Sequence, residues 1–422
     1  MRIHTRKAAA AVVLVASAAL ALSGCSQGAP APEPSKKAAA ETGPLKIGTL
    51  LPQTGTLENL IYGPRAAVKL AMKEINAAGG VLGQDVELVV EANEFDSSDP
   101  TIMNKSVDEI IKAHPSFVLG AMGTGNTNAA LPRLSEAGIL MGSPSNTGIA
   151  LAGINKLYFR TIASDVIQGH ALGNLVVKDG NTRVAMLAQN NDYGTGLRDN
   201  FQKTLEEAGA DLVYGANGSG EEFAEGQASF TSEVTAALAK KPDAVAIVSY
   251  KEAKQIIPEL AAQGFDLSKL YLVDGNTVPY EEFDPGLLEG AQGTTPGRAS
   301  KGKFLEDLTA ADSSVSQSTN FAPEAYDAVM LVALAAEKGG ATDTDTIVAN
   351  LHAVSGSEGG EKCSTFKDCA ALLKDKKEIH YEGQSGGGPL TEKNEPSTAL
   401  IGIYRYDAKN TPIAVSEVEE EG

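Results

Sequence analysis

The sequence predicts an α/β fold of two lobes, each an open, mostly parallel and doubly wound β-sheet with helices on both faces. Three observations lead to this prediction. Short apolar runs alternate with helical segments from Leu45 onward, and the alternation begins again after residues 160–165. Residues 244–248 are apolar throughout, as is typical of a parallel strand covered on both faces. A chain of 422 residues also exceeds the usual size of one domain.

The first half of the body is expected to contain four strands separated by three helices. Its first helix is the clearest, because apolar residues recur at helical spacing, Pro64 suits the first turn and two glycines suit the end. The expected strands are residues 45–51, 86–91, 117–120 and 139–141, and the expected helices are residues 64–77, 101–113 and 128–137.

The second half repeats this pattern and then changes. Strands are expected at 184–188, 244–248 and 270–273, and helices at 197–208 and 251–263. Beyond residue 293 we expect helices at 321–337 and 347–354, a last strand at 399–406 and a solvated acidic tail at 417–421. Sheets of this kind place ligands at the carboxyl ends of their strands, so two facing sheets form a binding cleft.

The N-terminal segment, residues 1–24, has the features of a bacterial lipoprotein signal peptide. Three cations precede an apolar stretch, residues 8–22, that is too short for a comfortable membrane span. The sequence Leu-Ser-Gly-Cys at 22–25 fits a lipobox, in which Cys25 is acylated and becomes the new N-terminus. The alternative is an ordinary secretory signal that is cleaved near a cysteine by chance.

Residues 25–44 are rich in Ala, Pro, Gly and Lys and lack apolar periodicity, so they are expected to form a flexible tether. A single acyl chain holds a protein only marginally, so stable anchoring would need more than one chain. These features predict a protein anchored by lipid on the extracytoplasmic face of a bacterial cell membrane.

Charge and composition exclude several classes of function. The 54 acidic and 35 basic residues give a net charge of −19, which argues against nucleic acid or anionic lipid as the main partner. The chain has no Trp and few aromatic residues for stacking on bases. With three Cys and five scattered His, we assign no metal site and no cofactor.

Several short stretches, in this order and spacing, resemble the extracytoplasmic solute-binding proteins of branched-chain-amino-acid-type ABC importers, which have the type I periplasmic-binding-protein fold. The resemblance covers about residues 45–406. It is carried by Lys-Ile-Gly at 46–48 with Thr-Gly at 54–55, Glu-Ile-Asn-Ala-Ala-Gly-Gly-Val-Leu-Gly at 74–83, Ser-Pro-Ser-Asn-Thr at 143–147, Phe-Arg-Thr at 159–161 leading to Asp165 and Gln-Gly at 168–169, Asp-Tyr-Gly-Thr-Gly-Leu at 192–197, and Lys-Pro-Asp-Ala-Val at 241–245.

The resemblance implies two lobes joined by a multi-strand hinge. Lobe 1 would hold residues 45–164 and 297–397, and lobe 2 would hold residues 165–296 and 398–422.

The resemblance also implies which residues hold the carboxylate of a ligand. Residues 123–127 form a small polar loop between a strand and a helix, where backbone N–H groups suit an anion. Taken alone, this loop is better explained as an ordinary turn whose Asn and Thr cap the helix. By the resemblance, Thr124 contacts the carboxylate, and Ser145 and Thr147 do so from a second loop.

An ammonium group needs carboxylates or oxygen dipoles around it. By the resemblance, Asp165 and Asp274 take this role, although Asp165 also suits a helix N-cap and Asp274 a turn residue. Tyr193 and Tyr250 would cover the ligand, unless they only pack between the lobes. Tyr62 is a weaker candidate for the pocket around the ligand's side chain.

The sequence departs from the family in its cysteines, because Gly123 stands where a first-lobe Cys can occur. Cys363 and Cys369 lie in an expected loop between residues 356 and 372, and we expect them to pair in an oxidising compartment. A loop this small would gain about 2 kcal/mol from the closure. A free thiol pair or a metal pair is the alternative, but no His stands at ligand spacing.

The resemblance implies a receptor that closes its lobes around a small amino acid, such as a branched-chain one, and presents it to membrane permease subunits. The same fold also serves receptors for urea, short amides or aromatic acids, and ligand-sensing modules of signalling systems. No nucleophile elbow, P-loop or zinc-protease motif is present, so no catalytic residue and no enzyme activity are assigned. A monomer is the default for a receptor that closes about a hinge.

Overall fold

The computed structural model describes residues 42–97 and 99–421. The predicted signal peptide, Cys25 and most of the predicted tether lie outside those residues. Among the helices described, none combines the length and the apolar character needed to cross a bilayer. The folded body begins with the strand that starts at Lys46.

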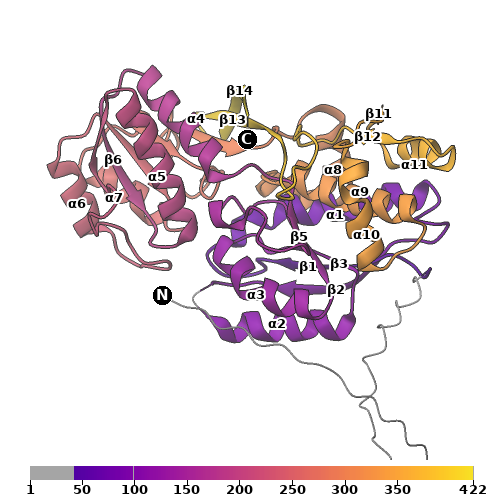
Figure 1. The fold of residues 1–422 in the computed structure, drawn as a ribbon. Helices are drawn as coiled ribbons and strands as arrows, with labels where there is room; N and C mark the ends of the chain where they lie inside the picture. The colour runs from indigo at the N-terminus through magenta and orange to yellow at the C-terminus, as the bar shows by residue number, and fades with distance from the viewer. Residues whose placement is uncertain (1–41, 98, 422) are drawn as a thin grey trace, which may run out of the picture. The chain divides into compact units, whose positions relative to one another are not determined.

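The first lobe is built on a five-stranded sheet with strand order β2-β1-β3-β4-β5, in which every neighbouring pair is parallel (Figure 1). The chain therefore winds outward from β1 in both directions, which confirms the predicted doubly wound class. β5 was not among the expected strands, because the sequence indicated only a junction between the two halves of the body near residues 160–165. The strands are β1 (Lys46–Leu51), β2 (Glu87–Asn93), β3 (Phe117–Gly120), β4 (Leu140–Ser143) and β5 (Tyr158–Arg160).

Helices cover both faces of this sheet, and strand residues alternate between the two cores. Phe117 and Leu119 pack with α1 and α9, whereas Val118 between them packs with α2 and α3. This alternation follows because consecutive residues of a strand point to opposite faces. The helices are α1 (Tyr62–Ala77), α2 (Pro100–Ala113), α3 (Thr124–Glu136) and α9 (Ala322–Gly339).

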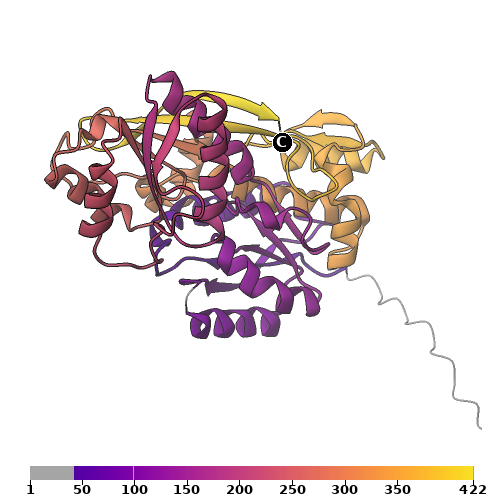
Figure 2. The ribbon, with the colours of Figure 1, turned by 60° about the vertical axis from the view of Figure 1, so that its left-hand side comes forward.

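The second lobe is built on a seven-stranded sheet with order β14-β13-β10-β9-β8-β6-β7. The strands from β7 to β10 are parallel, and β13 runs antiparallel to both of its neighbours. Figure 2 shows β13 and β14 side by side in yellow. The strands are β6 (Arg183–Ala188), β7 (Asp211–Tyr214), β8 (Ala244–Val248), β9 (Leu270–Leu272), β10 (Gln292–Pro296), β13 (Thr398–Tyr406) and β14 (Pro412–Glu421).

The acidic residues 417–421 do not form a tail after the last strand, as the sequence indicated, although Val418 and Glu419 are exposed. These residues are the end of β14, paired with β13 from Glu417 opposite Gly402 to Glu421 opposite Thr398. Backbone hydrogen bonds hold an edge strand whatever its side chains are, and charged side chains are common there. The acidic composition of these residues therefore gave no indication in the sequence that they form a strand.

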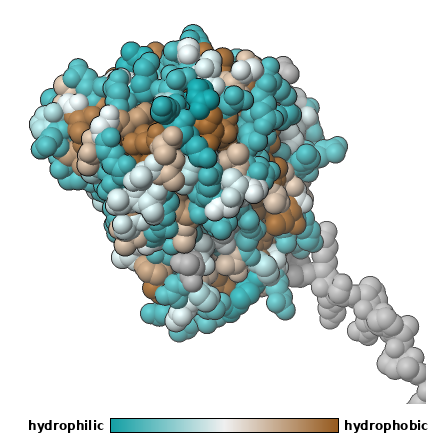
Figure 3. All heavy atoms as spheres, turned by 90° about the vertical axis from the view of Figure 1, so that its left-hand side faces the viewer, coloured by the Kyte–Doolittle hydropathy of each residue, from teal (hydrophilic) through white to brown (hydrophobic). Residues whose placement is uncertain are grey.

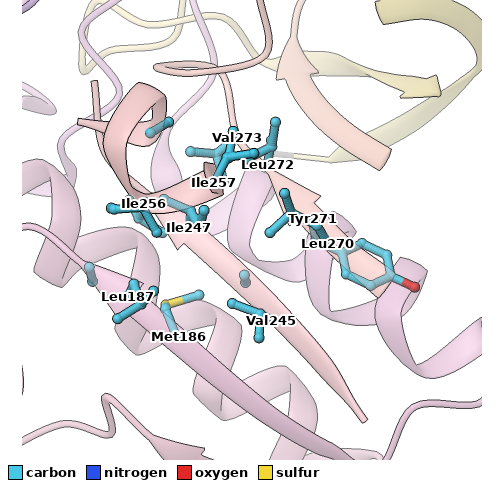
Figure 4. Packing of buried hydrophobic residues seen from close by; sticks show 14 of the residues in the cluster. Met186, Leu187, Val245, Ile247, Ile256, Ile257, Leu270, Tyr271, Leu272 and Val273 are labelled. Carbon is cyan, nitrogen blue, oxygen red and sulfur yellow. The ribbon is translucent and has the colours of Figure 1, made fainter. Parts of the chain in front are cut away.

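Four helices pack on the second sheet, and one continuous core joins them to its strands. Ile256 and Ile257 of α7 belong to the same buried cluster as Val245 and Ile247 of β8 and Leu272 of β9 (Figure 4). The apolar run that predicted a doubly covered strand at 244–248 is β8, fully buried along its length. The helices are α4 (Asp165–Lys178), α5 (Asp192–Glu207), α6 (Thr231–Ala239) and α7 (Ala253–Ala262).

The chain passes between the two sheets three times, from β5 to α4, from β10 to α8, and from the segment around residue 395 to β13. The part between the second and third passages adds helices and a small two-stranded sheet to the first lobe. These elements are α8 (Gly302–Ala311), α10 (Thr344–Ser355), β11 (Glu361–Cys363), α11 (Phe366–Lys374) and β12 (Ile379–Tyr381). The 3₁₀ helices are η1 (Glu58–Leu60), η2 (Ile149–Leu151), η3 (Leu267–Lys269) and η4 (Ser313–Gln317).

Hydrophobic residues lie among hydrophilic ones on the face shown in Figure 3, and a mixture of this kind is ordinary for a protein surface. The large apolar side chains exposed on the described chain come from several separate elements: Ile149, Ile154, Val166, Ile413, Val415 and Val418.

Two glycines let α4 lie very close to α5. A Cβ built on Gly169 would stand 2.8 Å from the Cβ of Asn200, and one built on Gly173 would stand 2.7 Å from the Cβ of Thr204. Such distances leave no room for a methyl group, so the two helices would have to move apart.

We therefore predict that Gly169→Ala lowers the free energy of unfolding by about 1–3 kcal/mol, because overpacking outweighs the gain in helix propensity. Denaturant titration measures the change. Gly196→Ala in α5 is the matched control, since its Cβ would meet nothing closer than 3.7 Å. Equal stabilities of the two variants would contradict the close-packing argument.

Candidate ligand-binding cleft

A narrow pocket lies between residues of the two lobes, at the carboxyl ends of the strands. Six of the seven residues expected to bind a ligand line it, from segments far apart in the sequence. The lining consists of Leu57, Leu60, Met122, Thr124, Ser145, Thr147 and Phe321 from the first lobe, and Tyr193, Tyr250, Asp274 and Gly275 from the second. This is the position that the topology of two facing parallel sheets predicts.

Thr124 is the first residue of α3, so residues 123–127 are not the loop that the sequence indicated but the start of a helix. Glu94, which follows β2 and is fully buried, holds this turn. It accepts hydrogen bonds from the backbone N–H groups of Met122 (2.5 Å) and Gly123 (3.1 Å) and from Nδ2 of Asn126 (2.9 Å). Burial raises the pKa of Glu94 to about 8. Glu94 was not singled out from the sequence, because a single Glu after a strand has no pattern that marks it as the acceptor for the start of a helix.

Arg160 holds the backbone of the loop that carries Ser145 and Thr147. Nη1 of this buried guanidinium donates to the carbonyl oxygens of Asn146 (3.0 Å) and Gly148 (2.9 Å). Glu395 pairs with the same guanidinium, at 3.0 Å from Nε. The backbone of the loop is thus held by a charged pair that lies outside the pocket lining.

The three hydroxyl residues do not have the same freedom. Ser145 Oγ donates to the carbonyl oxygen of Met122 at 2.8 Å, which occupies the only hydrogen of that hydroxyl. Thr147 Oγ1 is buried and has no hydrogen-bond partner among the described residues. Thr124 begins a helix, whose first-turn N–H groups have no intrahelical acceptor. Thr124 and Thr147 are therefore better placed than Ser145 to donate to an anion.

Asp165 lies beside the pocket, as the first residue of α4, and is not its N-cap. Ser164 takes the capping role, with its side chain accepting from the N–H of Val166. The Asp165 side chain is fully buried, and neither carboxylate oxygen has a hydrogen-bond partner among the described residues. Burial, followed by the nearby charge of Asp274, raises the pKa of Asp165 well above its ordinary value, and the neighbouring Thr147 hydroxyl and the charge of Arg160 oppose this shift.

Asp274 follows β9 and is bonded to a tyrosine pair. Tyr193 donates its hydroxyl to Oδ1 of Asp274 at 2.7 Å, and its ring stacks on that of Tyr250 with centroids 5.3 Å apart. Tyr193 lies in the first turn of α5 rather than on a loop before it, because Asn191 caps that helix. Burial raises the pKa of Asp274 to about 6.

The remaining walls are apolar and were not singled out from the sequence. Leu57 and Leu60 come from the segment after β1, and Phe321 precedes α9 with a left-handed backbone (φ 61°). Isolated apolar residues carry no sequence signal that separates a ligand pocket from a core. Tyr62, a weaker candidate, lines a separate open groove with Glu58.

The structure places a disulfide between Cys363 and Cys369, whose Cα atoms are 5.3 Å apart. The two residues do not share a loop, as the sequence indicated. Cys363 ends β11, and Cys369 lies in α11, so the bridge ties a strand to the helix that follows it.

Comparisons with known proteins agree with this architecture. The family model described as "Periplasmic binding protein" matches residues 44–369. A leucine-, isoleucine-, valine-, threonine- and alanine-binding protein of Pseudomonas aeruginosa is 32% identical over 39% of this chain, a match that spans only 44% of that relative. The chemotactic signal transduction substrate-binding protein BasB of Halobacterium salinarum is 27% identical over 85% of this chain and 86% of its own.

Solved structures share the fold at low sequence identity. The isoleucine complex of the branched-chain amino acid binding protein LivJ from Streptococcus pneumoniae aligns with a TM-score of 0.70 and 22% identity, over 90% of this chain and all of that one. A benzoate-bound solute-binding protein of an ABC transporter from R. palustris aligns with a TM-score of 0.68 and 18% identity, over 89% of this chain and 96% of that one. The relatives and solved structures named here are solute-binding proteins. With its two parallel-sheet lobes and a family match over most of its length, this chain belongs to the periplasmic binding protein family.

Proposed function

We propose that this protein is the lipid-anchored substrate-binding component of an ABC importer and captures a small amino acid, such as a branched-chain one, in the cleft between its lobes. The observation that carries the proposal is the pair of buried carboxyl groups, Asp165 and Asp274, beside one small pocket. The same proposal includes lobe boundaries near residues 164, 297 and 397 and acylation at Cys25. It also includes delivery of the solute to a permease by a monomeric protein.

A ligand ammonium group explains why two acidic side chains are buried together. Burying a carboxylate is costly unless donors or a cation compensate it, and Asp165 makes no hydrogen bond among the described residues, although the neighbouring Thr147 hydroxyl offsets part of this cost. An ammonium group brings three N–H donors and a full positive charge. It would pair with Asp165 and with Asp274, which already accepts from Tyr193.

The carboxylate of the same ligand has suitable donors in the first lobe. Glu94 already occupies the N–H groups of Met122 and Gly123. An anion would therefore bind to the first turn of α3, at Thr124, and to the hydroxyl of Thr147.

The apolar walls favour an aliphatic side chain. Leu57, Leu60 and Phe321 offer no hydrogen-bonding side-chain atoms, so they would contact the part of a ligand that has none. The amino-acid-binding relatives and the isoleucine-bound structure support this choice.

A second candidate is an aromatic acid, supported by the stacked Tyr193–Tyr250 pair and by the benzoate-bound relative of the same fold. Such a ligand has a carboxylate but no ammonium group, so it would leave Asp165 without a counter-charge. Urea and short amides lack a full positive charge too. A sensing role, as the name of BasB suggests for that relative, would use the same closure.

We predict that Asp165→Asn and Asp274→Asn each weaken amino-acid binding by about 30-fold to 1,000-fold, because an ammonium group loses a charged partner in a dry site. A melting-temperature screen against amino acids, urea, amides and aromatic acids identifies the solute, and calorimetry measures its affinity. Asp199→Asn, on the exposed face of α5, is the matched control. Undiminished affinity in both site variants would remove the acidic pair from the binding site.

We also predict that amino-acid affinity falls as the pH is lowered through about 6, by up to about tenfold per pH unit. The ammonium group binds the ionised carboxylates, and the raised pKa values of Asp165 and Asp274 mean that protons compete with it. Binding at pH 7 should therefore release protons, which calorimetry in buffers of different ionisation enthalpy detects. An aromatic acid would show the opposite sign, because its anion binds better when the neighbouring carboxyl groups are neutral.

A further inference from the structure

We propose that a second set of contacts, outside the ligand pocket, forms a latch that sets how long a bound solute is retained. The inference rests on the proposed function, because it concerns closure around a solute. The latch consists of Gly55, Thr56, Ser97 and Asn128 from the first lobe and Asp192, Glu225 and Lys251 from the second.

Glu225 is the centre of the latch. It lies between β7 and α6 in the second lobe, and its Oε2 accepts a hydrogen bond from Ser97 Oγ of the first lobe at 3.0 Å. Thr56 Oγ1 lies 3.3 Å from Oε1 and is in contact with it, while the one hydrogen of this hydroxyl is donated to Asp96 at 2.7 Å. Nδ2 of Asn191 approaches Oε2 at 3.3 Å from within the second lobe and holds the carboxylate in place.

Lys251 contacts the same first-lobe segment from a different loop. Its Nζ donates to the carbonyl oxygen of Gly55 at 3.0 Å, and its backbone N–H donates to that of Thr56 at 3.3 Å. Asp96 fixes Thr56 from the first lobe, accepting from its N–H at 2.5 Å and from its hydroxyl at 2.7 Å. Both sides of the contact are therefore held by their own lobes, which reduces the entropy lost on closure.

A third contact joins the helices next to the pocket. Nδ2 of Asn128 in α3 donates to Oδ2 of Asp192 at the start of α5, at 3.0 Å.

The latch is adjacent to the pocket but separate from it. Thr56, Asp192 and Lys251 each precede or follow a pocket residue by one position, yet no latch residue belongs to the pocket lining of the described chain. The contacts form only when the lobes meet, so they stabilise the closed form without touching a solute. A ligand leaves after the lobes open, and weaker latches should therefore raise the dissociation rate more than they lower the association rate.

The experiment compares Lys251→Met and Glu225→Ala with two matched controls. Lys254→Met removes a lysine that pairs with Glu282 inside the second lobe, and Glu233→Ala removes a glutamate bonded to Gln227 there. Stopped-flow kinetics with the solute found in the melting screen should give about a fivefold to tenfold faster dissociation for each latch variant. The association rate and the melting temperature of the ligand-free protein should stay unchanged, as should the kinetics of both controls.

A second measurement does not depend on the identity of the solute. The full chain with Cys25→Ser leaves only the disulfide-bonded cysteines, so spin labels can be attached at Lys105→Cys in α2 and Lys203→Cys in α5, both exposed positions. Pulsed electron resonance should show more of the longer, open distance in the latch variants than in the controls. An unchanged distance distribution would overturn the latch, and a changed distribution with unchanged dissociation would overturn its role in retention. If the screen finds no solute, the proposed function fails and the distance measurement still decides whether the latch exists.

Discussion

The buried guanidinium of Arg160 is the interaction on which the arrangement of the cleft depends. This side chain ends β5, is 1% exposed, and donates to two carbonyl oxygens of the ligand-facing loop while it pairs with Glu395. The backbone N–H of Arg160 also donates to the carbonyl oxygen of Asn394 at 3.0 Å. One residue thereby joins the first passage between the lobes, the segment that leads into the last passage, and the loop that carries Thr147. Removing one of these partners would leave a buried charge uncompensated and would strongly destabilise the fold. The three segments are therefore held as a unit.

Polar groups around the cleft fall into two kinds, and the distinction separates scaffold from site. Glu94, Arg160 and Asn146 are buried and bonded to several backbone groups, so they hold turns in place. Asp165 and the hydroxyl of Thr147 are equally buried but have no partner among the described residues. Native proteins pair nearly all of their buried polar groups, so the second kind is an exception, and it supports the binding role proposed for Asp165 and Thr147.

The parts of the fold that could be predicted from the sequence are those whose residues show one clear pattern. β8 is apolar at every position because it is covered on both faces, and the sequence located it correctly. α4 was not predicted, because its close packing on α5 depends on Gly169 and Gly173, and glycine residues in a sequence do not indicate a helix. β14 was missed because an edge strand keeps its pairing through backbone groups, whatever its side chains are. In the site, Thr124, Asp274 and Tyr193 were found by resemblance to a family rather than by their own pattern, and Glu94 had no signal at all.

A shared fold leaves the choice of solute to a few side chains. The isoleucine-bound and benzoate-bound relatives align with this chain equally well, with TM-scores of 0.70 and 0.68, so the backbone does not separate the two classes of ligand. What separates them is charge, because both bring a carboxylate and only the amino acid brings a cation. Two ionised carboxyl groups would repel the anion of an aromatic acid, whereas they would attract the ammonium group of an amino acid. Under the proposed function, Asp165 and Asp274 are therefore the residues whose charge selects an amino acid over an aromatic acid on the same scaffold.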